Sequence, residues 1–505
     1  MTALAALALP PAAAFAGDRL NRLVLGKSYE GLFGIGARFA LGLATGMLVF
    51  SQVLLLAVLA GVNVAGPLAW AVLVWGWIEF CLLVPGCVKS FQPVKFQPGY
   101  LWCLLLLPVA YFFRVIGQLS VVEGTLEFDA VAFWVLKAKI LYLAQGRDFI
   151  DCIHQSNLSY AHWDYPLLVP GLYTLGYGLM GHVDEFVNKV WPLWMVVALA
   201  LAILSLGNVW KRPHALPFAA VLLLCYLPAT VQFIRWEGAT IPMVFYTGLA
   251  SLLVTTALMN NEPAGLVAAV PVFAGCAGTK FEGIVFAAVW GACLVFIGWR
   301  RRWFKTPRLR PAAIVACSCL IPYALFRLAK PVAHFESGWW KSGLESPGVT
   351  LTRFPQVWFL NLCSRFFGPD FAQWQAGDKG GLVWTGHWTS LGSLVNKELT
   401  VLPWLILVLL AIALFKARNR FTVLLVSGAS LAVFTVLALV IASLNRMQAD
   451  VANVIDFATN VVGRYYYPFL MAWFLGLVAV WFADHNEPAP ETKPAPAPAP
   501  KKKKK

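Results

Sequence analysis

Acidic residues gather in one polar segment of an otherwise apolar chain. The segment 121–185 holds a large share of the few Asp and Glu residues. Asp129 stands where an apolar stretch gives way to helical spacing, and Glu127 precedes it by two positions. An ionised carboxylate at this point can take the proton of an attacking hydroxyl group within hydrogen-bond distance. The alternative role for Asp129 is a helix cap, because Asp is a preferred residue at the start of a helix.

Two further charged residues interrupt an apolar stretch near the middle of the chain. Lys280 and Glu282 lie in the sequence Gly-Thr-Lys-Phe-Glu-Gly, with apolar residues on both sides. Ionisable groups at such depth are costly and are usually functional or paired. Lys280 can hold a phosphate as a compact point charge. The alternative is a structural Lys280–Glu282 pair that closes a helix break, which a turn between the two glycines would permit.

Three polar residues stand beside aromatic residues at predicted membrane interfaces. Arg464 precedes Tyr-Tyr-Tyr-Pro at the start of the last apolar stretch, where it can pair with a lipid phosphate or mark the headgroup zone. His162 and Asp164 lie in His-Trp-Asp-Tyr-Pro. They can hydrogen-bond a sugar or position a helix, and Asp164 before Tyr-Pro can also stabilise a turn.

The motifs of nucleotide-dependent and zinc enzymes are missing from the chain. There is no phosphate-binding loop, no Gly-rich dinucleotide motif, no His-Glu-x-x-His and no Asp-x-Asp pair. We therefore expect no cofactor and no metal site; the alternative is a divalent-metal requirement, which the sequence does not indicate but leaves open. An enzyme without a site for a soluble nucleotide donor can take its activated substrate from the lipid phase.

The composition predicts an all-α polytopic membrane protein. The chain has 505 residues, is 60% hydrophobic and only 12% charged, and has a mean hydropathy of +0.71, whereas soluble domains are roughly 25% charged. Apolar runs of roughly 20 residues recur, which is the length that crosses a hydrocarbon core of about 30 Å. The net charge of +15 does not indicate a nucleic-acid partner, because the basic residues occur in short loops and in the tail, without a base-reading motif.

About twelve membrane spans are predicted. With the N-terminus in the cytoplasm, alternation places the basic short loops on the cytoplasmic side, as the positive-inside rule requires. The long loops 121–185, 329–398 and 444–464 then lie outside, and both termini lie inside. The candidate spans are 37–62, 64–88, 99–120, 186–207, 213–235, 240–259, 264–279, 281–299, 311–328, 399–415, 421–443 and 465–483.

The positioning of the acidic loop depends on the apolar segment Pro166–Gly181. If this segment crossed the membrane, Lys211 and Arg212 would face outward. It is short for a span and contains two prolines, so we predict an interfacial or re-entrant helix in the first outer loop. The alternative is a thirteenth span.

Within the spans, we expect Glu79 and Arg114 to form a structural pair.

These stretches resemble, in their order, the GT-C superfamily of polytopic glycosyltransferases, in particular bacterial members similar to lipid A aminoarabinose transferase and protein O-mannosyltransferases. The resemblance covers residues 99–483. It is carried by Glu127-Phe-Asp129 with the helical pattern after it, by Tyr165-Pro166-Leu167 leading to a span that ends at a basic loop, by Thr279-Lys280 with Glu282-Gly283, and by Arg464-Tyr465 with Pro468.

The resemblance implies a glycosyltransferase of the bacterial inner membrane. Such an enzyme uses a polyprenyl-phosphate-linked sugar donor and a glycan, lipid or protein acceptor on the outer face. The resemblance also implies that Asp129 is the catalytic base and that Lys280 and Arg464 contact the donor phosphate. The chain departs from the family where many members carry an Asp, because Glu237 and Thr240 stand there instead.

The resemblance, the charge pattern and the composition together divide the chain into four parts. We expect a cytoplasmic lead at 1–36, two additional spans at 37–98, a GT-C-like transmembrane domain at 99–483 with the outer loops 121–185 and 329–398, and a disordered Pro/Ala/Lys tail at 484–505.

Two other function classes stay open. A lipid or solute transporter or flippase predicts ionisable residues deep in several spans. A non-catalytic membrane assembly protein predicts a degenerate site.

Overall fold

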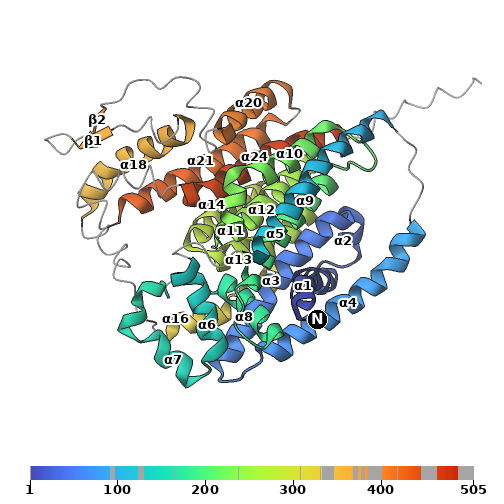
Figure 1. Ribbon diagram of the computed structural model, residues 1–505. Coiled ribbons are helices and arrows are strands. Elements are labelled where there is room, and N and C mark those ends of the chain that lie inside the picture. The colour runs from blue at the N-terminus through green and yellow to red at the C-terminus, as the bar shows by residue number, and fades with distance from the viewer. Residues whose placement is uncertain are drawn as a thin grey trace, which may run out of the picture.

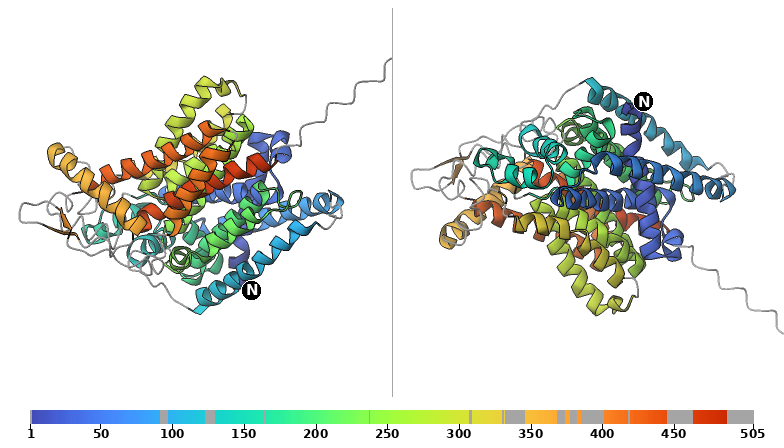
Figure 2. Two further views of the ribbon diagram at one scale, coloured as in Figure 1. Left: turned by 90° about the horizontal axis from the view of Figure 1, so that it is seen from above. Right: turned by 90° about the horizontal axis from the view of Figure 1, so that it is seen from below.

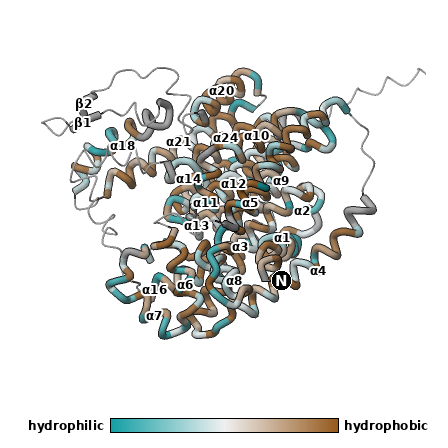
Figure 3. The backbone as a smooth tube through the Cα atoms, viewed as in Figure 1, coloured by the Kyte–Doolittle hydropathy of each residue, from teal (hydrophilic) through white to brown (hydrophobic). Residues whose placement is uncertain are grey.

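The computed structural model shows a bundle of long helices (Figure 1). Apolar residues follow the long helices, and hydrophilic residues are found mainly toward helix ends and connections (Figure 3). Among the described residues, the strands are the three-residue β1 (Trp374–Ala376) and β2 (Leu382–Trp384), which pair antiparallel. The structure describes residues 2–90, 97–122, 130–163, 165–236, 238–306, 309–329, 331, 346–367, 374–376, 382–384, 401–417, 419–444 and 463–486.

Each of the twelve predicted spans corresponds to helical structure. Within the described residues, nine helices are long and apolar enough to cross a membrane, and a pair bent by 51° would be a tenth. The remaining two, α13 (Pro263–Thr279) and α20 (Val401–Lys416), are shorter. The integral membrane class is thus confirmed, while the count of about twelve stays a prediction. The nine are α3 (Ile35–Leu59), α4 (Ala65–Ser90), η1 with α5 (Pro98–Leu105, Leu106–Val122), α9 (Phe186–Leu206), α12 (Thr240–Asn260), α14 (Phe281–Arg300), α15 with α16 (Leu309–Ser318, Ile321–Leu328), α21 (Arg420–Ala442) and α24 (Gly463–Asn486), and the bent pair is α10 (Ala215–Tyr226) with α11 (Pro228–Arg235).

One end of the bundle, here called the Lys211 end, is identified by contacts between loops distant in sequence. The Tyr100 hydroxyl donates to the Trp210 carbonyl oxygen at 2.7 Å. The Arg301 guanidinium donates to Asn261 Oδ1 at 3.2 Å. Asn261 ends α12 in the left-handed conformation, and a proline opens α13 two residues later. All of these loops were predicted to share the cytoplasmic side.

The other end, here called the Lys280 end, gathers the loops that were predicted to lie outside. Lys280 Nζ lies 4.2 Å from the ring centroid of Tyr465, and His154 Nε2 lies 2.7 Å from the Ala329 carbonyl oxygen. In Figure 1, α6 (Leu136–Leu143), α7 (Arg147–Ile153), α8 (Leu168–Met180) and α16 gather at this end. The grouping of loops therefore agrees with the predicted alternation. Which end faces the cytoplasm stays a prediction.

Helix α8 is the segment that was predicted not to cross. Its 13 residues span about 20 Å at ~1.5 Å per residue, well short of the ~30 Å hydrocarbon core. Almost all of its residues are buried, and it packs against α3, α4 and α6. Thr174 fixes it to α6 by donating to the Ala138 carbonyl oxygen at 3.0 Å. A helix covered on so many sides fits the re-entrant form of the prediction rather than the surface form.

Helix α18 (Pro347–Phe367) lies at the edge of the bundle in both views of Figure 2. It packs against α21, where Trp358 Nε1 donates to Thr435 Oγ1 at 3.3 Å. The rest of the second long loop, the loop after 444 and the tail after 486 lie largely outside the described residues.

The N-terminal segment is part of the bundle, which the division of the chain did not anticipate. Residues Thr2–Leu25 form α1, which packs against α3 and α4, so this part of the predicted lead 1–36 is not a separate segment. Pro11 has no N–H group to donate to the Leu7 carbonyl oxygen, and Trp194 Nε1 of α9 donates to it instead at 3.0 Å. The missing helical bond is thus replaced from a neighbouring helix, as membrane helices with proline require.

Small residues allow α1 to approach α3 and α4 closely. A Cβ atom added at Gly42 would overlap the carbonyl oxygen of Ala14, and one at Gly17 would overlap that of Gly42. A Cβ atom added at Gly76 of α4 would likewise overlap the carbonyl oxygen of Ala12. Close packing of small residues is a main source of helix association in membranes, where no hydrophobic effect drives helices together.

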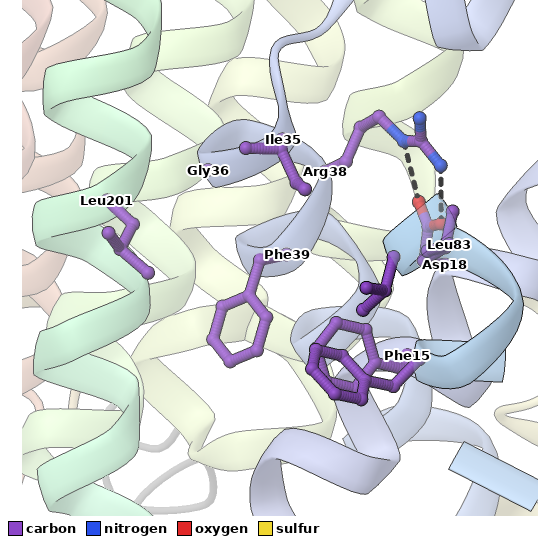
Figure 4. A pocket seen from close by; sticks show the side chains of 10 residues that line it. Phe15, Asp18, Ile35, Gly36, Arg38, Phe39, Leu83 and Leu201 are labelled. Carbon is purple, nitrogen blue, oxygen red and sulfur yellow. Dashed lines mark hydrogen bonds and ion pairs between the residues drawn. The ribbon is translucent and has the colours of Figure 1, made fainter. Parts of the chain in front are cut away.

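Charged residues near the Lys211 end tie the same three helices together. Arg38 donates to both Asp18 carboxylate oxygens, at 3.1 and 2.7 Å (Figure 4). Arg22 lies 3.2 Å from Asp18 and donates to Glu79 at 3.0 Å. The expected pairing of Glu79 with Arg114 is therefore wrong: its partner comes from α1, which sequence reasoning had not placed in the bundle.

The α1–α3 packing predicts opposite effects for one substitution at two glycines. Gly42→Ala should lower stability by about 1–3 kcal/mol, because the added methyl group meets backbone atoms. Gly291→Ala in α14, where a Cβ would meet nothing within 4 Å, should be neutral or stabilising by about 0.5–1 kcal/mol. Unfolding of the purified protein in detergent measures both. Equal unfolding midpoints for the two variants would contradict the packing.

Candidate functional site

Lys280 and Glu282 form a buried ion pair at the break between α13 and α14. Lys280 Nζ lies 3.0 Å from Glu282 Oε1, and the two side chains are only 11% and 7% exposed. The pair forms because Lys280 has an extended backbone, with φ −157° and ψ 161°, while Glu282 occupies the first turn of α14. The positive end of the helix dipole favours a carboxylate there. The convergence considered from the Gly-Thr-Lys-Phe-Glu-Gly sequence is therefore present.

The start of α24 covers this ion pair. The Lys280 ammonium lies over the Tyr465 ring at 4.2 Å from its centroid, a cation–π geometry. Arg464 directly precedes Tyr465 and belongs to α24, but its side chain lies outside what the structure describes. The structure thus brings Lys280 and Glu282 to the segment that carries the third predicted donor-binding residue.

Neighbouring helices hold the start of α24 in place. The Tyr467 and Thr230 hydroxyl oxygens are 2.6 Å apart, which joins α24 to α11. Thr247 of α12 donates to the Pro468 carbonyl oxygen at 3.1 Å. Because both bonds are buried, the position of Tyr465 relative to Lys280 is fixed by the packing of three helices.

A second buried lysine lies at the same end of the bundle. Lys137 of α6 is fully buried, and its ammonium donates to the His162 carbonyl oxygen at 2.6 Å. The same ammonium lies 5.1 and 5.5 Å from the ring centroids of Trp134 and Tyr165. These four residues are called the Lys137 cluster below. Sequence reasoning gave Lys137 no role, although a lysine among apolar residues is a usable signal.

His162 is a buried part of this cluster. Its ring stacks on Tyr165 at 5.0 Å and 13°, and it meets Phe133 edge-on at 4.5 Å. Its backbone is left-handed, with φ 52°, which is uncommon for a residue other than glycine. The conformation turns the chain so that its carbonyl oxygen reaches Lys137. His162 was predicted to contact a sugar. Its described contacts, however, are with Lys137, Tyr165 and Phe133, which give it a structural role.

The predicted acids of the first outer loop, Asp129, Glu127 and Asp164, lie outside the described residues. Ala130, which follows Asp129, is fully buried and begins the π-helical turn η2 (Ala130–Val135). Such turns are frequent at functional sites. The assignments of the three acids stay predictions, and the described chain beside Asp129 enters the bundle rather than the solvent.

The sequence departs from the GT-C pattern at Glu237 and Thr240, of which only Thr240 is described by the structure. Glu237 lies outside the described residues, whereas Thr240 is buried and opens α12. A Cβ atom added at Gly238 would lie 3.9 Å from Trp134 Nε1. The turn between α11 and α12 therefore approaches the Lys137 cluster.

Helix α8 connects the two lysine sites. A Cβ atom added at Gly278 would lie 3.3 Å from the Leu168 side chain. Gly278 stands two residues before Lys280, and Leu168 stands three residues after Tyr165. One end of the bundle thus holds the ammonium groups of Lys280 and Lys137, which have aromatic and carboxylate neighbours. These are two of the three buried lysines among the described residues, and the third is Lys189 in the first turn of α9. In such surroundings of low dielectric constant, a cation interacts with an anionic ligand far more strongly than it would in water.

Other site chemistry is limited within the described residues. They contain no group of three or more His, Cys, Asp and Glu side chains that could hold a metal ion, so the expectation of a metal-independent site stays a prediction. Cys152 of α7 is a free thiol, and partial burial together with the nearby Asp148 and Asp151 raises its pKa. At neutral pH this thiol is therefore a weaker nucleophile than an exposed cysteine.

No protein-family model, curated protein or solved structure matches this chain. Its function is therefore argued from its own residues and geometry.

The Lys280–Glu282 pair predicts a clear mutational pattern. Lys280→Met should lower stability by about 3–5 kcal/mol, because it leaves a buried carboxylate without its cation. The double variant Lys280→Met/Glu282→Leu should recover most of that loss. The control is Lys139→Met, because the Lys139–Glu185 pair is longer, at 3.7 Å, and more exposed, at 35% and 41%. Its loss should cost at most about 1 kcal/mol. An equally small loss for Lys280→Met would show that the buried pair is not formed.

Proposed function

We propose that this chain is an integral membrane glycosyltransferase. It transfers a sugar from a polyprenyl-phosphate-linked donor to an acceptor hydroxyl group on the non-cytoplasmic face. The observation that carries the proposal is the convergence, at the Lys280 end, of the Lys280–Glu282 pair, the start of α24 and the Lys137 cluster. Each of the four stretches that carry the resemblance to GT-C enzymes contributes residues to this end.

The donor phosphate binds at Lys280 and Arg464 in this proposal. Both residues belong to segments at one end of the bundle, where the lipid tail of a donor can lie among apolar helix surfaces. Lys280 is already paired with Glu282, so an incoming phosphate shares the ammonium with that carboxylate. As the sugar–phosphate bond breaks, negative charge grows on the phosphate, and fixed cations stabilise that charge in the transition state.

The transfer itself is a single displacement. The acceptor oxygen forms a bond to the anomeric carbon, the bond from that carbon to the phosphate oxygen breaks, and the phosphate leaves with the electron pair. Asp129 takes the acceptor proton. The acceptor enters between the loops 121–185 and 329–398. A positioned base of this kind contributes roughly 10²–10⁴-fold to the rate.

Glu282, Glu127, Asp164 and His162 are the proposed sugar contacts. Among them, Glu282 has the clearest physical basis. Both of its carboxylate oxygens are buried and lack a hydrogen bond of good geometry, although Lys280 Nζ is 3.0 Å from one of them. A buried acceptor in this condition is costly unless a donor reaches it. A sugar hydroxyl group supplies such a donor.

A lipid or solute transporter or flippase is the second candidate, and one observation favours it. Asp18 and Arg22 of α1 pair with Arg38 and Glu79, which are charges within the candidate spans α3 and α4. These charges are paired with one another and lie near the Lys211 end, so they do not form a path across the bundle. Donor-dependent sugar transfer separates the enzyme from the transporter and from a non-catalytic assembly protein. Substrate flux across sealed vesicles separates the latter two.

The proposed base is tested by an isosteric substitution. Asp129→Asn should reduce the formation of the glycosylated product about 10²–10⁴-fold, because an amide cannot take the acceptor proton. The product is identified first, by mass spectrometry of envelope glycans and lipids from cells with and without the protein. Asp151→Asn, an exposed acid of the same loop, is the matched control and should leave product formation unchanged.

Near-normal product formation by Asp129→Asn would remove Asp129 from the mechanism. A product pattern that is identical with and without the protein, accompanied by lipid flux in vesicles, would instead support the transporter.

A further inference from the structure

A pocket of about 290 Å³ lies between α1, α3, α4 and α9 near the Lys211 end of the bundle. In Figure 4, Phe15, Phe39 and Leu201 border it from three helices, and the Arg38–Asp18 pair lies beside it. It is close to the lower limit of small-molecule pockets, roughly 300 Å³. The glycosyltransferase proposal uses none of these residues, because they lie at the opposite end of the bundle from Lys280.

The wall of the pocket is apolar although two charged residues take part in it. Arg38 and Asp18 direct their polar atoms at each other, with two hydrogen bonds of 3.1 and 2.7 Å. The other lining side chains are aromatic or aliphatic, among them Phe15 and Phe80, whose ring centroids are 5.0 Å apart. A polar ligand would lose its hydration here without gaining partners. Hydrocarbon is the chemistry that fits.

The mouth of the pocket, here defined by its exposed apolar lining residues, belongs to candidate membrane spans. Ile35, Val84 and Leu201 line the pocket and are 59%, 39% and 37% exposed. They belong to α3, α4 and α9, which are three of the candidate spans. Large apolar side chains exposed at this place on a spanning helix face lipid. The occupant can therefore enter directly from the bilayer.

The charge beside the mouth selects the headgroup of that lipid. The arginines of this charged network are Arg19, Arg22 and Arg38. They are balanced by three acids, Asp18, Glu79 and, from α2 (Lys27–Leu32), Glu30. The loop that follows α9 adds Lys211 and Arg212, both exposed. This loop begins close to the pocket, because Gly34, next to the lining residue Ile35, packs against Ser205 in the last turn of α9. The excess charge beside the mouth is positive and complements a phosphate.

We propose that this pocket binds one acyl chain of an anionic glycerophospholipid, whose phosphate lies beside Lys211 and Arg212. The lipid belongs to the leaflet at the Lys211 end. It fills a gap next to the helices that hold α1 in the bundle, and it is a resident component rather than a substrate.

Native mass spectrometry of the purified, delipidated protein tests this assignment. Phosphatidylglycerol and phosphatidylcholine with identical acyl chains are titrated separately in a non-ionic detergent. We expect one phosphatidylglycerol per chain at saturation, with at least fivefold weaker binding of phosphatidylcholine. Leu201→Trp and Ile35→Trp, which fill the pocket from different helices, should each weaken phosphatidylglycerol binding at least tenfold.

Two controls give the assignment its specificity. Leu328→Trp, at a side chain 74% exposed near the other end, should bind phosphatidylglycerol as the unchanged protein does. Lys211→Ala should reduce the preference for phosphatidylglycerol about fivefold, the contribution of one basic side chain near an anionic surface. The assignment is overturned if both tryptophan variants keep full binding, if the two lipids bind equally, or if polyprenyl phosphate displaces phosphatidylglycerol from the pocket.

Discussion

The rest of the Lys280 end depends on how one buried ammonium group is accommodated. A lysine placed between two apolar helices is costly unless a counter-charge and polarisable neighbours surround it. Glu282 supplies the counter-charge from the first turn of α14, and Tyr465 supplies the aromatic face from α24. This requirement fixes the break between α13 and α14, and it brings α24 against that break. The ends of three helices are thereby assembled around one charge.

The Lys137 cluster also accommodates a buried ammonium group, but it does so with different neighbours. Lys137 uses a backbone carbonyl oxygen and two aromatic faces, and the carbonyl is available because His162 adopts a left-handed conformation. Helix α8 then connects the two lysines through the contact of Leu168 with Gly278. Two buried cations at one end of a bundle make that end receptive to an anionic headgroup. This physical property is what the glycosyltransferase proposal requires of its donor site.

Sequence reasoning predicted those features that depend on local pattern. Apolar run length located the twelve helical regions, and the alternation of basic loops grouped them at two ends. The glycines around Lys280 and Glu282 indicated that the two side chains could converge. These signals are local because membrane spans must satisfy their own backbone hydrogen bonds. The sequence could therefore indicate each helix without information about its neighbours.

The features that sequence reasoning missed depend on contacts between distant segments. Helix α1 resembles a leader because it is rich in alanine and has two prolines, yet those small residues are what allow it to pack against Gly42 and Gly76. With α1 left out of the bundle, Glu79 could not be assigned its partner Arg22. The role of Lys137 likewise depends on His162, which is 25 residues away. The periodicity of apolar residues in a sequence contains no information about pairings between such distant segments.

The central claim is that the Lys280 end of the bundle lies on the non-cytoplasmic side. A membrane-impermeant thiol reagent tests it on intact cells that carry one cysteine in a protein otherwise free of cysteine. Ser156 and Lys211 are exposed at opposite ends, so Ser156→Cys and Lys211→Cys form a matched pair. We predict that Ser156→Cys is labelled in intact cells and that Lys211→Cys is labelled only after lysis. The reverse pattern would contradict the account, because it would place the candidate site in the cytoplasm.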